Sequence, residues 1–166
     1  MRYESLRHPF PALYAPDSRV LILGSFPSVK SREQRFFYGH PQNRFWRVMA
    51  VLFDESVPQT IEEKRALLLS HRIALWDVIA SCDISGSSDA SIRDAVPNDL
   101  SPIFDVADIR CVFTNGGKAH EFYQKYALPL TAREDIRLPS TSPANAAYSL
   151  EKLIGEWQTV RKALEN

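Results

Sequence analysis

The sequence predicts an α/β domain with a mainly parallel sheet. Four short apolar segments of strand length alternate with segments whose apolar residues recur at helical spacing, which is typical of a parallel sheet covered by helices. The first segment, residues 19–24, is apolar without alternation and ends in a glycine, as in a strand buried on both faces. The 166 residues contain no repeat or linker and match the usual size of one domain, spanning 1–166.

Local signals mark where the predicted elements begin and end. The spacing of Phe45, Trp46 and Met49 predicts a helix, and Thr60 followed by Glu63 has the pattern of a capping box at the start of the next one. Pro139 ends the last strand. The predicted strands span residues 19–24, 73–76, 108–114 and 136–138, and the predicted helices span 43–54, 60–70, 100–106, 118–126 and 144–164. We expect mostly irregular structure at residues 1–18, 25–42 and 81–98.

Composition and charge exclude several classes of protein. Apolar residues make up 45% of the chain and charged residues 24%, which excludes a disordered or collagen-like chain. A net charge of zero, from 20 basic and 20 acidic side chains, argues against nucleic-acid binding by bulk charge alone. However, residues 30–47 hold five basic residues and one acid, whereas residues 73–108 hold seven acids and one base. The chain can therefore present a basic patch, although ordinary solvated surface charge explains the same counts.

Cysteine content and hydropathy limit the kinds of site and the cellular location that we expect for this protein. Cys82 and Cys111 are too few for a disulfide framework or for a site built from four thiolates. The longest apolar run, residues 48–53, is far shorter than the ~20 residues that cross a bilayer, and the N-terminus lacks the apolar segment of a signal peptide. We expect a monomeric, cytoplasmic protein with no metal, no cofactor and no membrane partner.

Three polar segments follow predicted strands and are the expected place of a functional site, because ligands of open parallel sheets bind at the carboxyl ends of the strands. They are residues 24–43, 115–118 and 139–145. Ser140 and Ser142 fit either a helix cap or a phosphate seat. Lys118 follows two glycines at a strand-to-helix turn and could hold a phosphate, although the spacing of a P-loop is missing.

Aromatic and polar residues are interleaved in the first of these segments. The aromatic run at residues 36–38 suits stacking on a nucleobase, or equally a small core beneath the loop. His40 fits a general acid or base, or a hydrogen-bonding strut. Asn43 fits the N-cap of the predicted helix, and Asp77, at the end of the second strand, fits catalysis, base recognition or a cap. The motifs GxSxG, HExxH, GxGxxG and CxxC are missing, which excludes the common hydrolase, zinc-protease and dinucleotide-binding classes.

Several stretches of the chain resemble the uracil-DNA glycosylase superfamily. They are VLILGSFPS at residues 20–28, YGHPQNRFW at 38–46, and LPSTSPAN at 138–145 leading into SLEKL at 149–153. The stretch NGGKA at 115–119 fits the superfamily's glycine turn before a helix. The HPQNRFW block most resembles the hypoxanthine-DNA (deoxyinosine) glycosylase group and, more distantly, the mismatch-specific uracil/thymine glycosylases.

This resemblance implies a three-layer α/β/α sandwich with a central, mainly parallel four-stranded sheet. It also implies a base excision repair enzyme that flips a deaminated nucleotide out of double- or single-stranded DNA and hydrolyses its N-glycosidic bond. Relatives that cut uracil usually carry Asn or Asp at the position of Phe26, and a glycine at that of Ser28. The second motif also lacks the histidine of the best-known uracil-DNA glycosylases. Both departures, in the turn and in the second motif, fit the hypoxanthine group, in which the resemblance implies a catalytic asparagine that maps to Asn43. The alternatives are a uracil- or mismatch-specific glycosylase and a non-catalytic lesion-binding domain.

The resemblance also suggests roles for individual residues. We expect Asn43 to hydrogen-bond the base or the attacking water, Tyr38 to stack on the flipped base, and the backbone around Ser25 and Phe26 to contact its edge. With no lysine obviously poised to form a Schiff base, we expect a monofunctional glycosylase. Further expected base-binding residues are His40, Asp77, Asn115 and Ser140, and the expected DNA-binding residues are Lys118, Arg44, Arg47, Ser142 and Pro143.

Overall fold

The computed structural model describes residues 2–165, and its main feature is a sheet of four parallel strands. The strand order is β3-β2-β6-β7. The bounds are β2 Val20–Gly24, β3 Ile73–Asp77, β6 Cys111–Asn115 and β7 Asp135–Leu138. Each overlaps one of the four predicted strands, so the predicted parallel sheet is confirmed.

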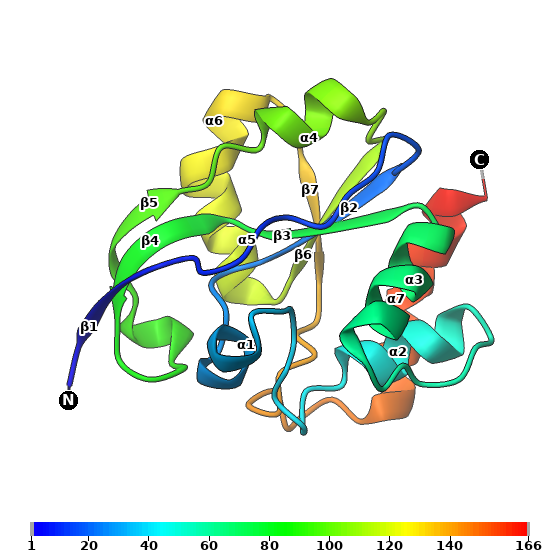
Figure 1. Ribbon diagram of the computed structural model, residues 1–166, viewed down its shortest axis with the longest axis horizontal. Helices are drawn as coiled ribbons and strands as arrows, with labels where there is room; N and C mark the ends of the chain where they lie inside the picture. The colour runs from blue at the N-terminus through cyan, green and yellow to red at the C-terminus, as the bar shows by residue number, and fades with distance from the viewer. Residues whose placement is uncertain (1, 166) are drawn as a thin grey trace.

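Residues along β2 alternate between two separate cores, which explains why this strand is apolar throughout. Val20 and Ile22 belong to one cluster of buried residues, whereas Leu21 and Leu23 belong to the other. Helices α2, α3 and α7 cover the first face of the sheet, and α4 with the segment running from α5 to α6 covers the second (Figure 1). The sheet is thus the middle layer of three, as the resemblance implied.

Helices connect the strands and cover both faces. Their bounds are α1 Val29–Gln34, α2 Phe45–Leu52, α3 Ile61–Ser70, α4 Ser101–Val106, α5 Gly117–Phe122, α6 Leu128–Thr131 and α7 Leu150–Leu164, with a 3₁₀ turn η1 at Asp89–Ser91 and a π-helical turn η2 at Tyr123–Ala127. At α3 the Thr60 hydroxyl accepts from the Glu63 amide at 3.1 Å, and the Glu63 carboxylate accepts from the amide of Gln59. This capping box confirms the predicted start of α3.

A second sheet of three antiparallel strands corrects the expectation of irregular structure at residues 1–18 and 81–98. Its order is β1-β4-β5, with bounds β1 Glu4–Arg7, β4 Ile79–Ile84 and β5 Arg93–Pro97. The register between β4 and β5 shifts at Ser81, which breaks the apolar alternation by which a strand is recognised. Buried and exposed positions do not alternate strictly along either strand, so neither shows the pattern by which a strand buried on one face is recognised.

Two helices also begin where the sequence did not place them. Helix α1 lies inside the predicted loop 25–42, and the Ser28 hydroxyl caps it by accepting from the Ser31 amide at 3.2 Å. Helix α7 begins at Leu150 with Ser149 as its N-cap, not near residue 144. The hydroxyls of Ser140 and Ser142 are therefore remote from the start of α7, and the expectation that they cap the last helix is wrong.

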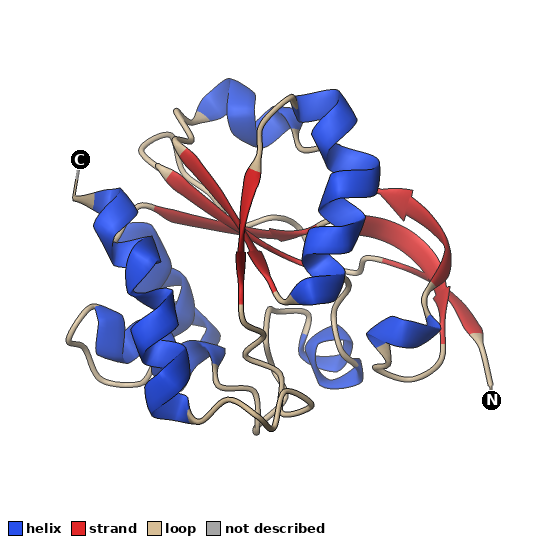
Figure 2. Cartoon of the chain, turned by 180° about the vertical axis from the view of Figure 1, so that it is seen from behind, coloured by secondary structure: helices blue, strands red, loops and turns tan. Residues whose placement is uncertain are grey.

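The carboxyl ends of the four parallel strands meet at one edge of the sheet. The strands end at Gly24, Asp77, Asn115 and Leu138, and the loops that follow them gather below the sheet in the view of Figure 2. Residues 2–165 include no helix long and apolar enough to cross a membrane. The two cysteines are both free.

Candidate active site

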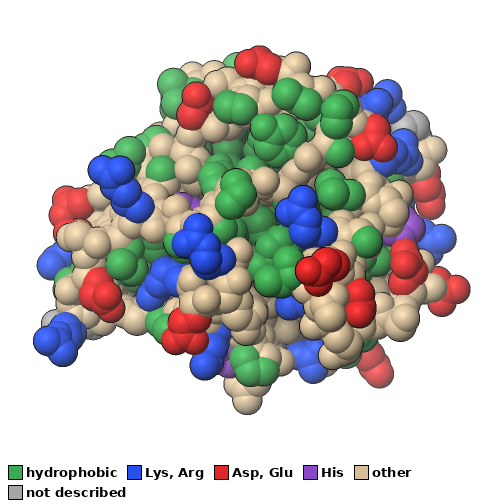
Figure 3. All heavy atoms as spheres, viewed as in Figure 1, with side chains coloured by type: hydrophobic (Ala, Val, Ile, Leu, Met, Phe, Trp, Pro, Cys, Tyr) green, Lys and Arg blue, Asp and Glu red, His purple; other side chains and the backbone are tan. Residues whose placement is uncertain are grey.

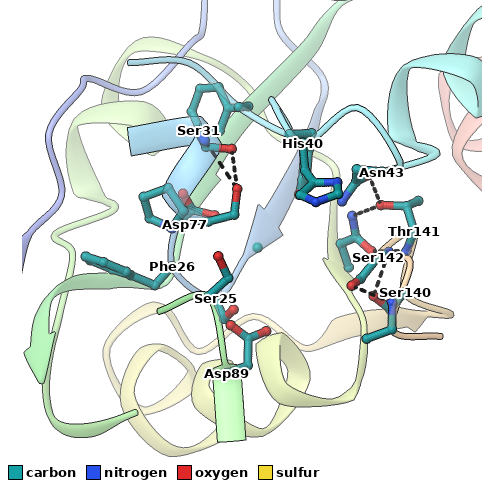
Figure 4. A pocket seen from close by; sticks show the side chains of 18 of the residues that line it. Ser25, Phe26, Ser31, His40, Asn43, Asp77, Asp89, Ser140, Thr141 and Ser142 are labelled. Carbon is teal, nitrogen blue, oxygen red and sulfur yellow. Dashed lines mark hydrogen bonds between the residues drawn. The ribbon is translucent and has the colours of Figure 1, made fainter. Parts of the chain in front are cut away.

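A cavity of about 330 Å³ opens at this edge of the sheet, within the ~300–1,000 Å³ range of small-molecule sites. The ends of β2, β3 and β6 line it, together with the loop that follows β2 and the segment that follows β7 (Figure 4). The predicted site residues that line it are Ser25, Phe26, Tyr38, His40, Asn43, Asp77, Asn115, Ser140, Ser142 and Pro143. The predicted base-binding set is thus brought together in one place.

The side chain of Asn43 is held by two hydrogen bonds to its oxygen. Oδ1 accepts from the backbone N–H of Phe45 at 3.0 Å and from the hydroxyl of Thr141 at 2.9 Å. A backbone N–H can only donate, so the atom beside Phe45 is the amide oxygen. Since both lone pairs of this oxygen are engaged, the group that Asn43 can offer to a ligand is the Nδ2 amino group, a hydrogen-bond donor.

Thr141 connects Asn43 to Asn115 through a chain of hydrogen bonds with a fixed direction. The Thr141 amide donates to Asn115 Oδ1 at 3.1 Å, and Asn115 Nδ2 donates to the Thr141 hydroxyl at 3.0 Å. The Thr141 hydroxyl, which accepts from Asn115, must then donate its own hydrogen bond to Asn43. Thr141 is fully buried, so these hydrogen bonds are shielded from solvent. This hydrogen-bond relay from Asn115 through Thr141 fixes the carboxamide of Asn43 in one orientation.

Arg44 connects the two loops that carry Asn43 and Thr141. Its guanidinium donates to the carbonyl oxygens of Ser142 at 2.9 Å, Asn145 at 3.1 Å and Tyr148, and its amide donates to the carbonyl of Thr141 at 3.0 Å. The structure therefore corrects the expectation that Arg44 contacts DNA phosphate: both terminal nitrogens donate inside the protein and Nε is buried, so the side chain holds the segment after β7.

Tyr38, the expected stacking platform, lines the cavity, and its ring packs against Phe45 with centroids 4.2 Å apart. Burial, with a further contribution from the Asp77 carboxylate, raises the pKa of Tyr38 well above its usual value, and the nearby Asn115 side chain opposes this in part. The hydroxyl is therefore protonated and suited to donate to an acceptor on a ligand. The neighbouring Phe36 and Phe37 belong to the core, as the alternative interpretation held.

Asp77 is paired with a histidine that the sequence did not single out. Asp77 Oδ2 lies 2.7 Å from Nε2 of His8, and both side chains are almost completely buried. The ring of His8 packs against Phe10 and Trp76, with centroids 4.5 and 4.4 Å away. This pair fixes Asp77 at the floor of the cavity.

Gly24 is required because Asp77 lies against it. A methyl group on Gly24 would overlap Asp77 Oδ1 and lie 3.1 Å from the Tyr38 hydroxyl. We expect Gly24→Ala to lower the free energy of unfolding by about 1–3 kcal/mol, the usual effect of overpacking, as measured by urea denaturation. Gly155→Ala is the matched control, because nothing lies within 4 Å of that position in α7. An unfolding free energy equal to that of the wild type in Gly24→Ala would contradict this close approach.

Three residues of the cavity wall have local roles. The backbone oxygen of Ser25 accepts from the Ile79 amide at 3.1 Å, which ties the turn after β2 to β4. Nδ1 of His40 accepts from the Gln42 amide at 3.1 Å, as the strut interpretation expected. Ser140 Oγ accepts from the Ser142 amide at 3.1 Å and also packs against Gly116; the φ of 99° at Gly116 favours glycine.

Asp89 also lines the cavity, although the sequence did not mark it as a site residue. It begins η1, the turn between β4 and β5 of the second sheet. Burial raises the pKa of Asp89 to about 6 and the Asp77 carboxylate adds to this, whereas Ser25 and Lys118 lower it. The carboxyl is therefore mostly ionised at neutral pH. No sequence motif marked it, because its position depends on strands that were themselves not predicted.

A second cleft adjoins the cavity and shares Asp89, Asn115, Ser140 and Ser142 with it. Lys118 lines this cleft, and its ammonium group lies 3.2 Å from the Glu121 carboxylate. Arg137, which was not predicted, also lines it, with its guanidinium over Gly117. Arg47 lies exposed on the other side of Asn43. The cations are thus distributed around the opening of the site.

The face of the molecule shown in Figure 3 does not form one continuous basic field. On the face shown in Figure 3, Lys and Arg side chains alternate with Asp and Glu side chains. Within the basic stretch 30–47, Arg32 donates to the carbonyls of Pro27 and Gly86, and Lys30 pairs with Glu33. Among residues 2–165, no group of three or more His, Cys, Asp or Glu side chains is arranged to hold a metal ion.

Comparison with known proteins decides the family. The model of the uracil DNA glycosylase superfamily matches residues 11–164. The chain belongs to this superfamily. A hypoxanthine DNA glycosylase from Methanosarcina acetivorans is 36% identical over 157 residues, which cover 93% of this chain and 98% of that protein. A second hypoxanthine DNA glycosylase, from Methanosarcina barkeri, is 34% identical over 116 residues, covering 68% of this chain and 73% of that protein.

A solved structure confirms the superfamily fold. The solution NMR structure of a protein from Methanosarcina acetivorans, provisionally described as a uracil DNA glycosylase, has a TM-score of 0.80 and 36% sequence identity to this chain. The similarity covers 95% of this chain and 97% of that one. The resemblance drawn from the GSFPS, HPQNRFW and STSPAN stretches is thereby confirmed, for the uracil DNA glycosylase superfamily and for its three-layer fold.

Proposed function

We propose that this protein is a monofunctional DNA glycosylase of base excision repair that releases hypoxanthine from deoxyinosine. The observation that carries this proposal is the carboxamide of Asn43, fixed by Thr141 and Phe45 so that its amino group is the donor offered to the cavity. The names of the two Methanosarcina relatives support hypoxanthine as the base. We further propose that it acts in the cytoplasm as a monomer without a cofactor, on double- or single-stranded DNA with deaminated bases.

The chemistry requires a donor near the departing base. When the N-glycosidic bond breaks, its electron pair leaves with the base, and positive charge develops on the sugar. A water then bonds to C1′ and gives up one proton, and the base takes one up. An amino group held at Asn43 stabilises the negative charge that develops on the base, and one such oriented donor contributes roughly 2.7–4 kcal/mol in well-studied sites.

The damaged nucleotide must leave the helix to reach the cavity. Extrusion costs a few kcal/mol and is easiest for a mispaired base such as hypoxanthine opposite thymine. We assign the edge of the base to the backbone at Ser25 and Phe26, and the flanking phosphates to Lys118, Arg137 and Arg47. The exposed Pro143, between the cavity and the surface, is placed to enter the gap in the duplex.

Uracil is the second candidate base, because the superfamily that the chain matches is named for it. Phe26 argues against efficient uracil release, since it stands where uracil-cutting relatives carry a side chain that orients water. A non-catalytic lesion-binding domain is the alternative from another class, and it would bind damaged DNA without releasing a base.

A lesion panel tests these functions directly. Duplexes that carry hypoxanthine, xanthine, uracil or an alkylated purine at one position are incubated with excess enzyme, and the released base is measured over time. We expect hypoxanthine to be released fastest, with strand breaks only after alkali treatment. Faster release of uracil would favour the second candidate, binding without release would favour the lesion-binding domain, and nicking without alkali would contradict a monofunctional mechanism.

A further inference from the structure

We propose that the Asp89 carboxylate accepts the ring N–H that deamination creates in the base, and thereby separates hypoxanthine from adenine. This inference rests on the proposed function and names the group that reads the substrate. Asp89 lines the cavity beside Ser25, on a different side from Asn43 (Figure 4). The cavity therefore offers a donor at Asn43 and an acceptor at Asp89.

Asp89 is carried by a turn that is held in place from both ends. The buried Ser91 hydroxyl accepts from the Ser85 amide at 2.9 Å and donates to the Ser88 carbonyl at 2.6 Å. Ser87 Oγ accepts from the Val29 amide at 2.9 Å, which ties the turn to α1. The backbone that carries Asp89 is thereby held in place, which limits where the carboxylate can lie, as a group that reads one atom of a ligand requires.

Adenine and hypoxanthine differ in the atom that a carboxylate can test. In adenine N1 is a hydrogen-bond acceptor, whereas deamination places a hydrogen on N1 and a carbonyl at C6. An ionised carboxylate only accepts hydrogen bonds, so it pairs with N1–H of hypoxanthine and faces a second acceptor in adenine. Sites that hydrogen-bond one group of a substrate strongly reject an analogue that lacks it, because a buried polar group is then unpaired.

Electrostatics favour an acceptor at this position. The carboxyl of Asp89 is mostly ionised at neutral pH, with Lys118 nearby to oppose the repulsion from Asp77. The hydroxyl of Tyr38 and the amino group of Asn43 are both donors. Asp89 therefore supplies a hydrogen-bond acceptor, which neither Tyr38 nor Asn43 provides. Uracil also carries a ring N–H, at N3, which can donate to the same carboxylate.

The test compares two bases in Asp89→Asn and in the wild type. One duplex carries hypoxanthine, and the other carries unsubstituted purine, which keeps N1 as an acceptor and has nothing at C6. Single-turnover release is measured at pH 8. We expect Asp89→Asn to lower hypoxanthine release by about tenfold, because its amide oxygen can accept from N1–H only as an uncharged group, while purine release stays the same or rises. Asp105→Asn, on the exposed surface of α4, removes the same charge far from the cavity and should behave as the wild type.

The ratio of the two rates decides the proposal. An equal fall with both bases would overturn it, because Asp89 would then act on the water or the sugar. Because burial already disfavours the charge, the neutral amide of equal size should fold, which a thermal unfolding midpoint checks. Equilibrium binding of both duplexes gives a readout that needs no excision. If the wild type releases no base, the proposed function is refuted. If Asp89→Asn binds the hypoxanthine duplex over the purine duplex with the same preference as the wild type, the role of Asp89 is refuted.

Discussion

Asn43→Ala is expected to lower the single-turnover rate of hypoxanthine release by about 10²–10³-fold, the loss seen when one oriented donor to a developing charge is removed. Folding and DNA binding should remain, because the side chain is tied to the protein by the two hydrogen bonds of its oxygen; the N-cap of α2 is Arg44 and not the expected Asn43. The loss of these bonds costs about 1–3 kcal/mol. Single-turnover release and equilibrium DNA binding, measured on the same inosine duplex, separate these effects.

Asn43→Asp distinguishes donation to the base from activation of water. Aspartate keeps the size of the side chain and the oxygen that accepts from Phe45 and Thr141, but it presents a second oxygen where the amino group was. We expect it to be as slow as Asn43→Ala. A rate close to the wild type in Asn43→Asp would show that a donor is not needed at this position, which would contradict donation to the base. Gln42→Ala, the preceding exposed residue on the same loop, is the control and should keep full activity.

Thr141→Val is expected to give the second largest loss, although Thr141 lies behind Asn43 in the hydrogen-bond relay. Valine keeps the shape but leaves Asn115 Nδ2 without its acceptor and frees one lone pair of Asn43. Small displacements of a reacting group cost up to about 10²-fold, so we expect the rate to fall by about 10–100-fold. The unpaired buried groups should also lower the free energy of unfolding by about 1–3 kcal/mol.

Thr141→Ser separates positioning from simple stability. Serine retains the hydroxyl and should restore the rate of release to near the wild-type value, even if the missing methyl group lowers the unfolding free energy. Affinity for the inosine duplex should change little in either variant, since the effect is on the chemical step. If Thr141→Val releases hypoxanthine at the wild-type rate, then Asn43 is oriented by other contacts, and the relay has no catalytic role.

The parallel sheet and its helices were predictable mainly because three of its strands, β2, β3 and β6, are largely buried, whereas the edge strand β7 is partly exposed. Residues 20–24 show this clearly: alternate side chains enter two cores, so the strand is apolar at every position. The Thr60 capping box was readable for a different reason, since all of its partners lie within five residues of sequence. Signals of both kinds are local and therefore survive in a single sequence.

The relay and the second sheet were not predictable from local signals. Asn43 and Thr141 are 98 positions apart, and Asp77 and His8 are 69 apart, so neither pairing leaves a trace in spacing. Asp89 lies in a stretch rich in serine and aspartate whose strands are interrupted by register shifts. The role of Arg44 was mistaken because its neighbours suggested a basic surface, whereas its partners are backbone carbonyls after β7.

The antiparallel sheet β1-β4-β5 carries one residue that lines the cavity, Asp89, and one that holds a lining residue, His8, which pairs with Asp77. His8 directly follows β1, and Asp89 lies between β4 and β5. Asn43, the proposed catalytic residue, is held through Thr141 by Asn115 at the end of β6, so we expect the hairpin from Ile79 to Pro97 to tolerate change without disturbing it. Exchange of this hairpin between homologues is then a route to repair enzymes with an altered lesion range.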